Sequence, residues 1–310
     1  MAGLTGISKR NPLQSVFFIL CTIVLGFYVL GPLVGLFAAL PFYNGSMMEL
    51  VEKIMSAALH PEVKLPVLIL QGFATGIGLI VIPVLYLASI ERVRALEWFT
   101  VKPPLVILIV VPLLVLAFML PNSIFIEWNA NFSFPDFLKE FGTWARAREE
   151  AAAEITKLFT AFNSPGEFLL GLLVIALLPA VGEELVFRGM LQPEFFRASG
   201  NHHVAIWITA FIFSAFHMQF FGFVPRMFLG ALFGYIYMWS GNFWLPVLAH
   251  FVNNAFMVTM LYLNQLQVIT LDVETTEAAP WPMVLVFTVI FVALVYYCYR
   301  YFKRKSTALQ

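Results

Sequence analysis

The sequence predicts an all-α protein, a polytopic bundle of about eight transmembrane helices. Hydrophobic residues make up 61% of the 310 residues, charged residues only 12%, and phenylalanine occurs 33 times. In soluble domains about a quarter of the residues are charged, so a folded chain of this composition would expose too much apolar surface to stay in water. The zero net charge and the two cysteines also argue against a nucleic-acid-binding protein and a disulfide scaffold.

Eight apolar segments approach or exceed the length of about 20 residues that a spanning helix needs. They lie at residues 13–40, 65–90, 103–126, 166–190, 203–223, 225–241, 243–265 and 281–302. The sixth segment is short and follows the fifth closely, so seven spans with one re-entrant segment is an alternative. The first segment follows Lys9 and Arg10 and is longer than the apolar core of a signal peptide, which indicates a retained span.

These segments divide the chain into four regions. We expect N-terminal transmembrane helices at 1–126, a polar extracytoplasmic loop at 127–165, a second set of transmembrane helices at 166–265, and a last span with a basic tail at 266–310. Within the polar loop, residues 144–162 carry charged side chains with apolar ones on one side. This pattern predicts an amphipathic helix that lies on the membrane surface.

The distribution of basic residues predicts the orientation of the chain. Basic residues concentrate on the cytoplasmic side of membrane proteins. If both termini are cytoplasmic, 11 of the 18 Lys and Arg residues fall on that side, namely Lys9, Arg10, Arg92, Arg94, Lys102, Arg188, Arg197, Arg300, Lys303, Arg304 and Lys305. Most acidic residues fall on the other side. We therefore expect an integral protein of the plasma (inner) membrane with both termini in the cytoplasm.

The fourth apolar segment contains two adjacent carboxylates. Glu184 and Arg188 are four residues apart, acid before base, and can pair on one helix face. Glu183 points about 100° away and has no partner on its own helix. A charge at the centre of a spanning helix costs about 2.5 to 3.5 kcal/mol, so such residues usually face a protein interior or a wet cavity. The alternative is that both acids extend from the helix end and only stabilise the topology.

Two further apolar segments place polar side chains at helical spacing. Phe213 and His217 are four residues apart in the fifth segment, and His250 and Asn254 are four apart in the seventh. Hydrogen bonding between membrane helices is the alternative role for these residues. The rise of a helix puts Glu183 and His250 roughly 5 to 10 Å below the cytoplasmic surface and His217 nearer the midplane. The polar side chains can therefore share one pocket in the cytoplasmic half.

Prolines and glycines in the apolar segments predict local features of the helices. Pro179 and Pro246 each lie four residues before a polar candidate, Glu183 and His250. Our hypothesis is that both prolines kink their helices, widen the pocket and help to admit water, although proline is also common in membrane helices generally. Pairs of glycines four apart predict close helix contacts, at Gly31 and Gly35, Gly72 and Gly76, and Gly230 and Gly234.

The three polar patterns, in this order and each inside an apolar segment, resemble the motifs of the CAAX-protease and bacteriocin-processing (CPBP, or Abi-like) family of membrane proteins. This family includes the Ras-converting type of CAAX prenyl endopeptidase. The matching residues are Glu183, Glu184 and Arg188 for the first motif, Phe213 and His217 for the second, and His250 and Asn254 for the third. The resemblance covers about residues 166–265 and identifies them as the catalytic helices.

The resemblance implies a glutamate-dependent intramembrane endopeptidase. Peptide hydrolysis needs a base for the water, donors for the oxyanion and a proton for the leaving amine. We assign Glu183 as the base that activates water near the cytoplasmic membrane surface. We expect His217 to share the water and to move protons, and His250 and Asn254 to donate hydrogen bonds to the oxyanion. Glu184 and Arg188 are expected to support Glu183. Phe213 is expected to pack.

Other functions are compatible with the same residues. Two Glu and two His residues could bind zinc, but the sequence lacks His-Glu-x-x-His, and Asn254 suits an oxyanion donor better than a ligand. We therefore expect no cofactor, with a zinc-dependent protease as the rival. A non-catalytic scaffold, immunity protein or transporter is a different class of alternative. The expected partners are the lipid bilayer and a membrane-associated peptide or protein, including a lipid-modified one, and no nucleic acid. The substrate and the oligomeric state stay open.

Overall fold

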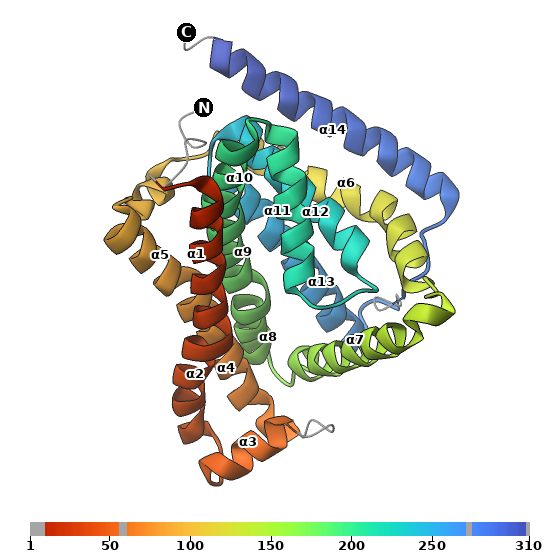
Figure 1. The fold of residues 1–310 in the computed structure, drawn as a ribbon. Helices are drawn as coiled ribbons and strands as arrows, with labels where there is room; N and C mark the ends of the chain where they lie inside the picture. Colours follow the sequence, from red (N-terminus) through yellow and green to blue (C-terminus); the bar gives the residue numbers. More distant parts are fainter. Residues whose placement is uncertain (1–9, 56–60, 271–274, 308–310) are drawn as a thin grey trace.

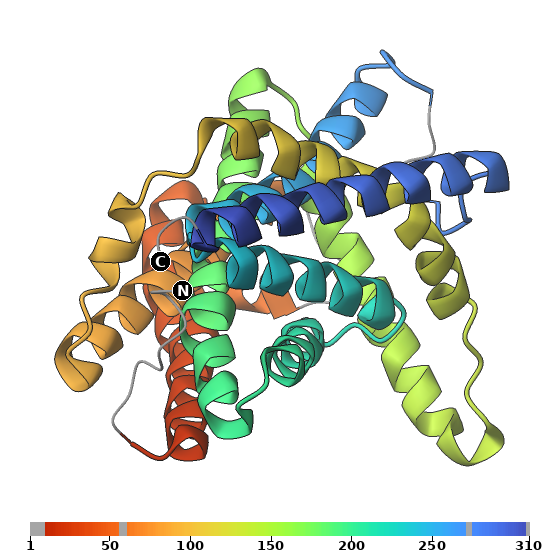
Figure 2. The same cartoon turned by 90° about the horizontal axis from the view of Figure 1, so that it is seen from above.

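A computed structural model of the protein describes residues 10–55, 61–270 and 275–307, and these form helices without any strand (Figures 1 and 2). The predicted all-α membrane bundle is confirmed. Lys9 lies outside the described residues, and the side chain of Lys305 is not described. The α-helices are α1 (Pro12–Leu25), α2 (Gly31–Ala39), α3 (Met47–Met55), α4 (Lys64–Thr75), α5 (Ile82–Tyr86), α6 (Leu105–Ala130), α7 (Lys139–Thr160), α8 (Pro165–Gly171), α9 (Leu178–Glu184), α10 (Gln192–Ser199), α11 (His202–Phe216), α12 (Phe223–Ser240), α13 (Trp244–Gln265) and α14 (Trp281–Thr307).

Short π-helical and 3-10 segments join several α-helices into longer continuous runs. The π-helical segments are η1 (Gly26–Leu30), η4 (Gly76–Val81), η5 (Leu87–Glu91), η8 (Leu172–Leu177) and η9 (Leu185–Leu191). The 3-10 segments are η2 (Leu40–Phe42), η3 (Pro61–Val63), η6 (Ala95–Thr100) and η7 (Asp136–Leu138). Such π-helical segments keep backbone groups bonded within the chain, as a bilayer requires, and they often occur at functional sites.

Among the described residues, six helical runs are long and apolar enough to cross a membrane. They are Pro12–Phe42, Pro61–Glu91, Leu105–Ala130, Pro165–Ser199, Trp244–Gln265 and Trp281–Arg304. The predicted fifth and sixth segments are also helices, but α11 has only 15 residues and α12 has 18. All eight predicted segments contain a helix, but α11 ends at Phe216 instead of 223, so His217 follows the helix, and the count of about eight spans is approximate.

The fourth predicted span lies at the centre of the bundle. Half of the most apolar stretch of this span is buried in the protein, whereas only 11% of the corresponding stretch of α14 is buried. Both α9 and η9 contact η4. In addition, η9 contacts α1 and α11, and α9 contacts α13. By contrast, α14 lies along one edge of the bundle beside α6 (Figure 1). One hydrophobic cluster joins α1, η9 and α11 through Ile19, Phe187 and Phe213. The central position of α9 brings its two glutamates within reach of several helices.

The polar loop contains the predicted amphipathic helix, which begins earlier than expected. Helix α7 spans Lys139–Thr160 instead of 144–162 and runs across the direction of α1 and α2 (Figure 1). Phe137 just before it, and Phe141 and Trp144 within it, expose apolar rings. This exposed aromatic edge suits a helix in a membrane interface. Its place on the membrane surface stays a prediction.

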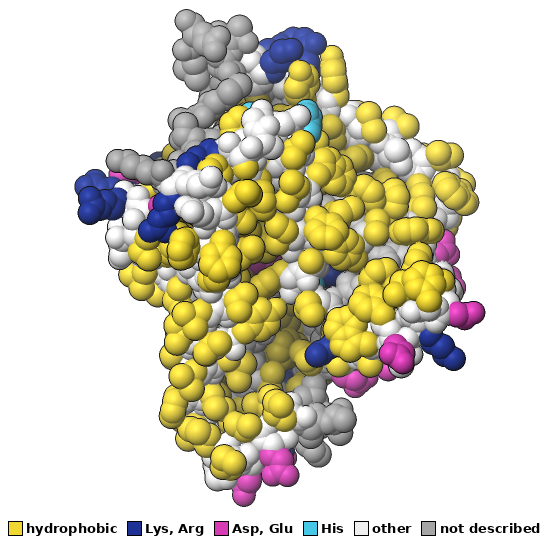
Figure 3. Space-filling model, viewed as in Figure 1, with side chains coloured by type: hydrophobic (Ala, Val, Ile, Leu, Met, Phe, Trp, Pro, Cys, Tyr) yellow, Lys and Arg dark blue, Asp and Glu magenta, His cyan; other side chains and the backbone are white. Residues whose placement is uncertain are grey.

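The molecular surface separates apolar from charged side chains. The face in Figure 3 is largely hydrophobic, with Lys and Arg near the chain termini, Asp and Glu near α3, and side chains of both signs near α7. This asymmetry agrees with the charge bias on which the predicted orientation rests. The orientation itself stays a prediction.

The structure corrects two details of the sequence-based expectations. Pro246 is the third residue of α13, where a backbone N–H has no intrahelical acceptor, so this proline removes no helical bond and the expected kink was wrong. Gly76 was expected at a close helix contact, but a Cβ added there would meet nothing within 4 Å. Gly31 fulfils its prediction, because an added Cβ would lie 2.7 Å from the Cα of Ala74 on α4.

Candidate functional site

A buried ion pair and a histidine form the deepest part of the candidate site. The Glu184 Oε1 atom accepts a 2.7 Å bond from Arg188 Nη1, which confirms the predicted pair. The same oxygen lies 2.9 Å from His250 Nδ1, and because a carboxylate only accepts, Nδ1 is the donor. Glu184 and Arg188 are fully buried and His250 is 4% exposed. Glu184 therefore orients the His250 ring, a contact between α9 and α13 that the sequence did not predict.

Glu183 lies on the other side of the same imidazole. Its Oε2 atom is 3.9 Å from His250 Nε2, too far for a hydrogen bond, and it is buried without a hydrogen-bond partner among the described residues. The whole residue is only 9% exposed. Buried carboxylate oxygens are normally hydrogen-bonded. Glu183 is therefore available to bind a water molecule or a substrate group. Glu184 Oε2 also lacks a partner among the described residues, but Glu184 is already held through Oε1 by Arg188 and His250.

Phe213 connects the two histidines. Its backbone carbonyl lies 2.9 Å from His217 Nδ1, which must donate because a carbonyl only accepts, so Nε2 of a neutral ring has a free lone pair. The Phe213 ring contacts the rings of His217 and His250 with centroids 5.2 and 5.9 Å apart. The Arg188 guanidinium lies 4.8 Å from its centroid. The Phe213 ring thus contacts all three side chains, which agrees with the packing role predicted for it.

Asn254 lies in the same helix as His250 but bonds to the backbone. Its Nδ2 atom donates to the carbonyl oxygen of Ile175 at 3.3 Å, and its Oδ1 accepts from Asn253 at 3.1 Å. Pro179 has no N–H, so the α-helical donor for the Ile175 carbonyl, four residues earlier, is missing. Asn254 supplies a donor from α13 in its place. A proline inside a membrane helix requires such a replacement hydrogen-bond donor from a neighbouring helix.

Other residues also surround the site, although they were not predicted from the sequence. The Phe233 ring stacks on His250 with centroids 5.2 Å apart, and Gly230 accepts a 2.8 Å bond from Arg188 Nη2 through its carbonyl. Arg226 was counted among the extracytoplasmic basic residues, yet its Nη1 atom is buried and its Nη2 atom bonds to Gln219. A signal was present, because Arg226 is an ionisable residue inside an apolar segment.

The described residues contain no group of three or more His, Cys, Asp or Glu side chains that could hold a metal ion. Glu184, one of the four possible ligands considered from the sequence, already bonds to Arg188 and His250. Metal independence stays a prediction.

Comparison with known proteins identifies the segment that carries these motifs. Residues 165–256 match the family model described as type II CAAX prenyl endopeptidase Rce1-like. The chain carries an Rce1-like domain. This domain begins with α8 and ends within α13, and it contains all seven motif residues. The resemblance expected from the sequence is confirmed over this segment.

Two curated bacterial proteins are similar to the Rce1-like part of the chain. The uncharacterized protein YpbD of Bacillus subtilis (strain 168) is 32% identical over 103 residues, which cover 32% of this chain and 47% of that protein. The membrane-embedded CAAX protease MroQ of Staphylococcus aureus (strain USA300) is 35% identical over 88 residues, covering 26% of this chain and 35% of MroQ. The chain therefore spans less than half the length of the curated relatives it matches. No solved structure matches it.

Proposed function

We propose that this protein is an intramembrane endopeptidase that hydrolyses a peptide bond near the cytoplasmic membrane surface with a glutamate-activated water. The Rce1-like domain supports the reaction class. One observation carries the mechanism: Glu183 Oε2 is buried, has no hydrogen-bond partner among the described residues and faces His250 Nε2 at 3.9 Å. Glu184 Oε2 also lacks a partner among the described residues, but its Oε1 already bonds to Arg188 and His250, so we assign Glu183 as the carboxylate that takes the proton.

Glu183 acts as the general base in this proposal. Its carboxylate takes a proton from the water, the water oxygen bonds to the peptide carbonyl carbon, and the carbonyl oxygen becomes negatively charged. His217 shares the water through its Nε2 lone pair, since its Nδ1 is held by the Phe213 carbonyl. When the C–N bond breaks, the proton passes to the leaving amine. The products are a carboxylate and an amine.

His250 and Asn254 stabilise the oxyanion in this proposal. Because Nδ1 of His250 already donates to Glu184, donation from Nε2 requires the doubly protonated ring. Asn254 must turn its amide from the Ile175 carbonyl toward the substrate. Glu184 and Arg188 act as positioning residues, because they orient His250 and do not touch the reacting atoms.

The substrate is proposed to be a membrane-associated peptide or protein. The MroQ relative is a membrane-embedded CAAX protease by name, which supports a lipid-modified C-terminus as one substrate class for this chain. Such a tail would arrive laterally through the bilayer, where its lipid partitions. No cofactor is required in this proposal.

The experiment that tests the proposal compares purified wild-type protein with Glu183→Gln. Both are incubated with a library of membrane-tethered peptides, and the products are identified by mass. We expect cleavage by the wild type and a loss of at least 10²-fold in the variant, because glutamine keeps the shape but cannot take a proton. Glu140→Gln, an exposed position on α7, is the matched control and should retain full activity. Full activity of Glu183→Gln would refute the glutamate mechanism.

Two further measurements separate the rival functions. Activity that persists after exhaustive chelation excludes a zinc-dependent protease, whereas activity that is lost and then restored by zinc supports one. A scaffold or immunity protein should still bind or protect after Glu183→Gln. A protease should lose its cellular effect together with turnover.

A further inference from the structure

The turn between α11 and α12 begins with His217. Helix α11 ends at Phe216 and α12 begins at Phe223, so residues 217–222 lie outside both helices. Met218, the next residue, has a φ of 56°, in the left-handed region that residues other than glycine rarely adopt. Such a conformation persists only where the surrounding structure holds the backbone. The position of His217 therefore depends on the contacts that fix this turn.

Glu149 of α7 makes two of these contacts. Its two carboxylate oxygens accept hydrogen bonds from Gln219 Nε2 and from the Phe221 backbone N–H, both at 3.2 Å. Gln219 in turn accepts a 3.0 Å bond from Arg226 Nη2 through its Oε1 atom. One half-buried carboxylate thus connects α7 to the turn and, through Gln219, to α12.

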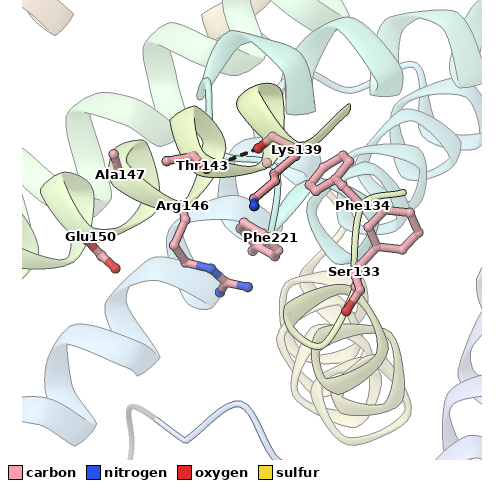
Figure 4. Close-up of a pocket in the computed structure, with 10 residues that line it drawn as sticks. Ser133, Phe134, Lys139, Thr143, Arg146, Ala147, Glu150 and Phe221 are labelled. Atoms are coloured by element: carbon pink, nitrogen blue, oxygen red, sulfur yellow. Dashed lines mark hydrogen bonds between the residues drawn. The ribbon is translucent and has the colours of Figure 1, made fainter. Parts of the chain in front are cut away.

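Arg146, three residues before Glu149, contacts the same aromatic residue. Its guanidinium lies over the Phe221 ring, 3.6 Å from the centroid, and both side chains line a cavity of about 510 Å³ beside α7 (Figure 4). Residues three apart are neighbours on a helix surface. Helix α7 therefore holds Phe221 twice, through its ring and through its backbone N–H.

Other helices hold only the far end of the turn. Asn129 of α6 accepts a 2.8 Å bond from the Val224 N–H, and Ser214 of α11 donates a 2.6 Å bond to the Phe223 carbonyl. Both contacts lie at the start of α12, beyond residues 217–222. Among the residues that the structure describes, Glu149 is the one carboxylate that bonds to the turn itself.

We propose that Glu149 is a positioning residue for the reaction, because it holds the turn of residues 217–222 and thereby places His217. This inference rests on the proposed endopeptidase function, in which His217 shares the attacking water. Glu149 lies outside residues 165–256, the part of the chain that matches the Rce1-like family model. A helix outside the Rce1-like domain would accordingly shape the site inside it.

The first test compares the kinetics of Glu149→Gln with wild type on a membrane-tethered peptide that wild type cleaves. The new amide has one accepting oxygen, and its NH₂ group faces the second donor, so one of the two bonds to the turn is lost. We expect kcat to fall about 10- to 100-fold with KM unchanged, because a misplacement of about 1 Å costs about 10²-fold in rate.

Glu150→Gln is the matched control. Glu150 is the next residue of α7, is exposed and lines the same cavity, and Figure 4 shows it apart from Phe221. The substitution removes the same charge from the same helix without touching the turn. Its kcat should equal that of wild type. An equal fall in both variants would mean that the charge of α7 matters and the contact with the turn does not, which overturns the inference.

An exchange of the two side chains tests the contact directly. In the double variant Glu149→Gln with Gln219→Glu, the new glutamine can accept from the Phe221 N–H and donate to the new glutamate. That glutamate can still accept from Arg226 Nη2. The exchange preserves the net charge and every bond of the network, so it should restore most of kcat. A merely structural loss at residue 149 would not be repaired by a second change at residue 219.

Hydrogen exchange separates this inference from the proposed function. Backbone amides of residues 217–222 should exchange about 10-fold faster in Glu149→Gln, the factor of one lost hydrogen bond, and at the wild-type rate in Glu150→Gln and in the double variant. The amides of α13 should not change in any variant. This pattern supports the role of Glu149 even if wild type cleaves no peptide, in which case only the proposed function fails.

Two results overturn the inference. One is an unchanged exchange rate of residues 217–222 in Glu149→Gln, which would show that the carboxylate does not hold the turn. The other is faster exchange with an unchanged kcat, which would show that the position of the turn does not affect the reaction.

Discussion

At the scale of single residues, the two adjacent glutamates of α9 have opposite surroundings. Glu184 Oε1 bonds to both Arg188 and His250, and all three side chains are buried. Glu183 makes no such bond through Oε2. One carboxylate therefore stabilises the site and the other is available for chemistry, although they are neighbours in the sequence. The difference arises because adjacent helical residues point about 100° apart, so α13 contacts them differently.

This difference predicts opposite effects of the same substitution. Glu184→Gln leaves the Arg188 charge buried without its counter-ion and should destabilise the protein by about 3 to 5 kcal/mol. Glu183→Gln should change stability by less than about 1 kcal/mol, because it breaks no hydrogen bond of Oε2. Thermal unfolding of the two purified variants in the same detergent checks this. A larger loss of stability in Glu183→Gln than in Glu184→Gln would contradict it.

The bond between Asn254 and Ile175 predicts a coupling with Pro179. Asn254→Ala removes the donor to the Ile175 carbonyl and should cost about 0.6 kcal/mol, with an upper value near 1.7 kcal/mol for such bonds in membranes. Pro179→Ala provides a backbone N–H that can bond to the same carbonyl, so the cost of Asn254→Ala should shrink in that background. A double-mutant cycle on unfolding free energies measures the coupling. Additive effects would show that the two residues act independently.

At the scale of elements, the N-terminal helices contact through glycine backbones. Helix α2 packs on α4, where Gly31 meets Ala74 and Gly35 meets Leu70, with distances of 2.7 and 2.9 Å from an added Cβ to the partner Cα atoms. Membrane helices associate largely through such close packing, because lipid removes the hydrophobic drive between them. Spacing in the sequence predicted this contact at Gly31 but also a contact at Gly76 that does not form.

Alanine substitutions should distinguish these two glycines. Gly31→Ala should destabilise the protein by about 1 to 3 kcal/mol, because the new methyl group would overlap the α4 backbone. Gly76→Ala has open space around it and should be neutral or stabilising by up to about 1 kcal/mol, the helix preference of alanine. Unfolding of both variants in detergent provides the comparison. Equal effects at the two positions would mean that the α2–α4 contact is looser than described.

At the scale of the whole molecule, the distribution of charge predicts the orientation in the membrane. Basic side chains lie near the termini, acidic ones near α3, and side chains of both signs near α7 (Figure 3). We propose that the termini face the cytoplasm of the plasma (inner) membrane, that α7 lies on the opposite side, and that the Rce1-like domain is the catalytic region between the outer helices.

Thiol labelling tests this orientation. In a background with Cys21→Ser and Cys298→Ala, Glu140→Cys on α7 should react with a membrane-impermeant maleimide in intact cells. Lys102→Cys, between η6 and α6, should react only after the membrane is permeabilised. Both positions are exposed in the structure, so access to the reagent depends on the side of the membrane. The reverse pattern would place both termini outside.

The sequence by itself determined the helical membrane class, the eight helical segments, the Glu184–Arg188 pair and the motif residues. These are properties of composition and of short helical spacing, which a local pattern contains. Only the tertiary structure decided that His250 bonds to Glu184, that Asn254 serves the carbonyl left by Pro179, and that Arg226 turns inward. Such contacts depend on how each helix is rotated and packed against helices distant in the chain, and no local period records that rotation.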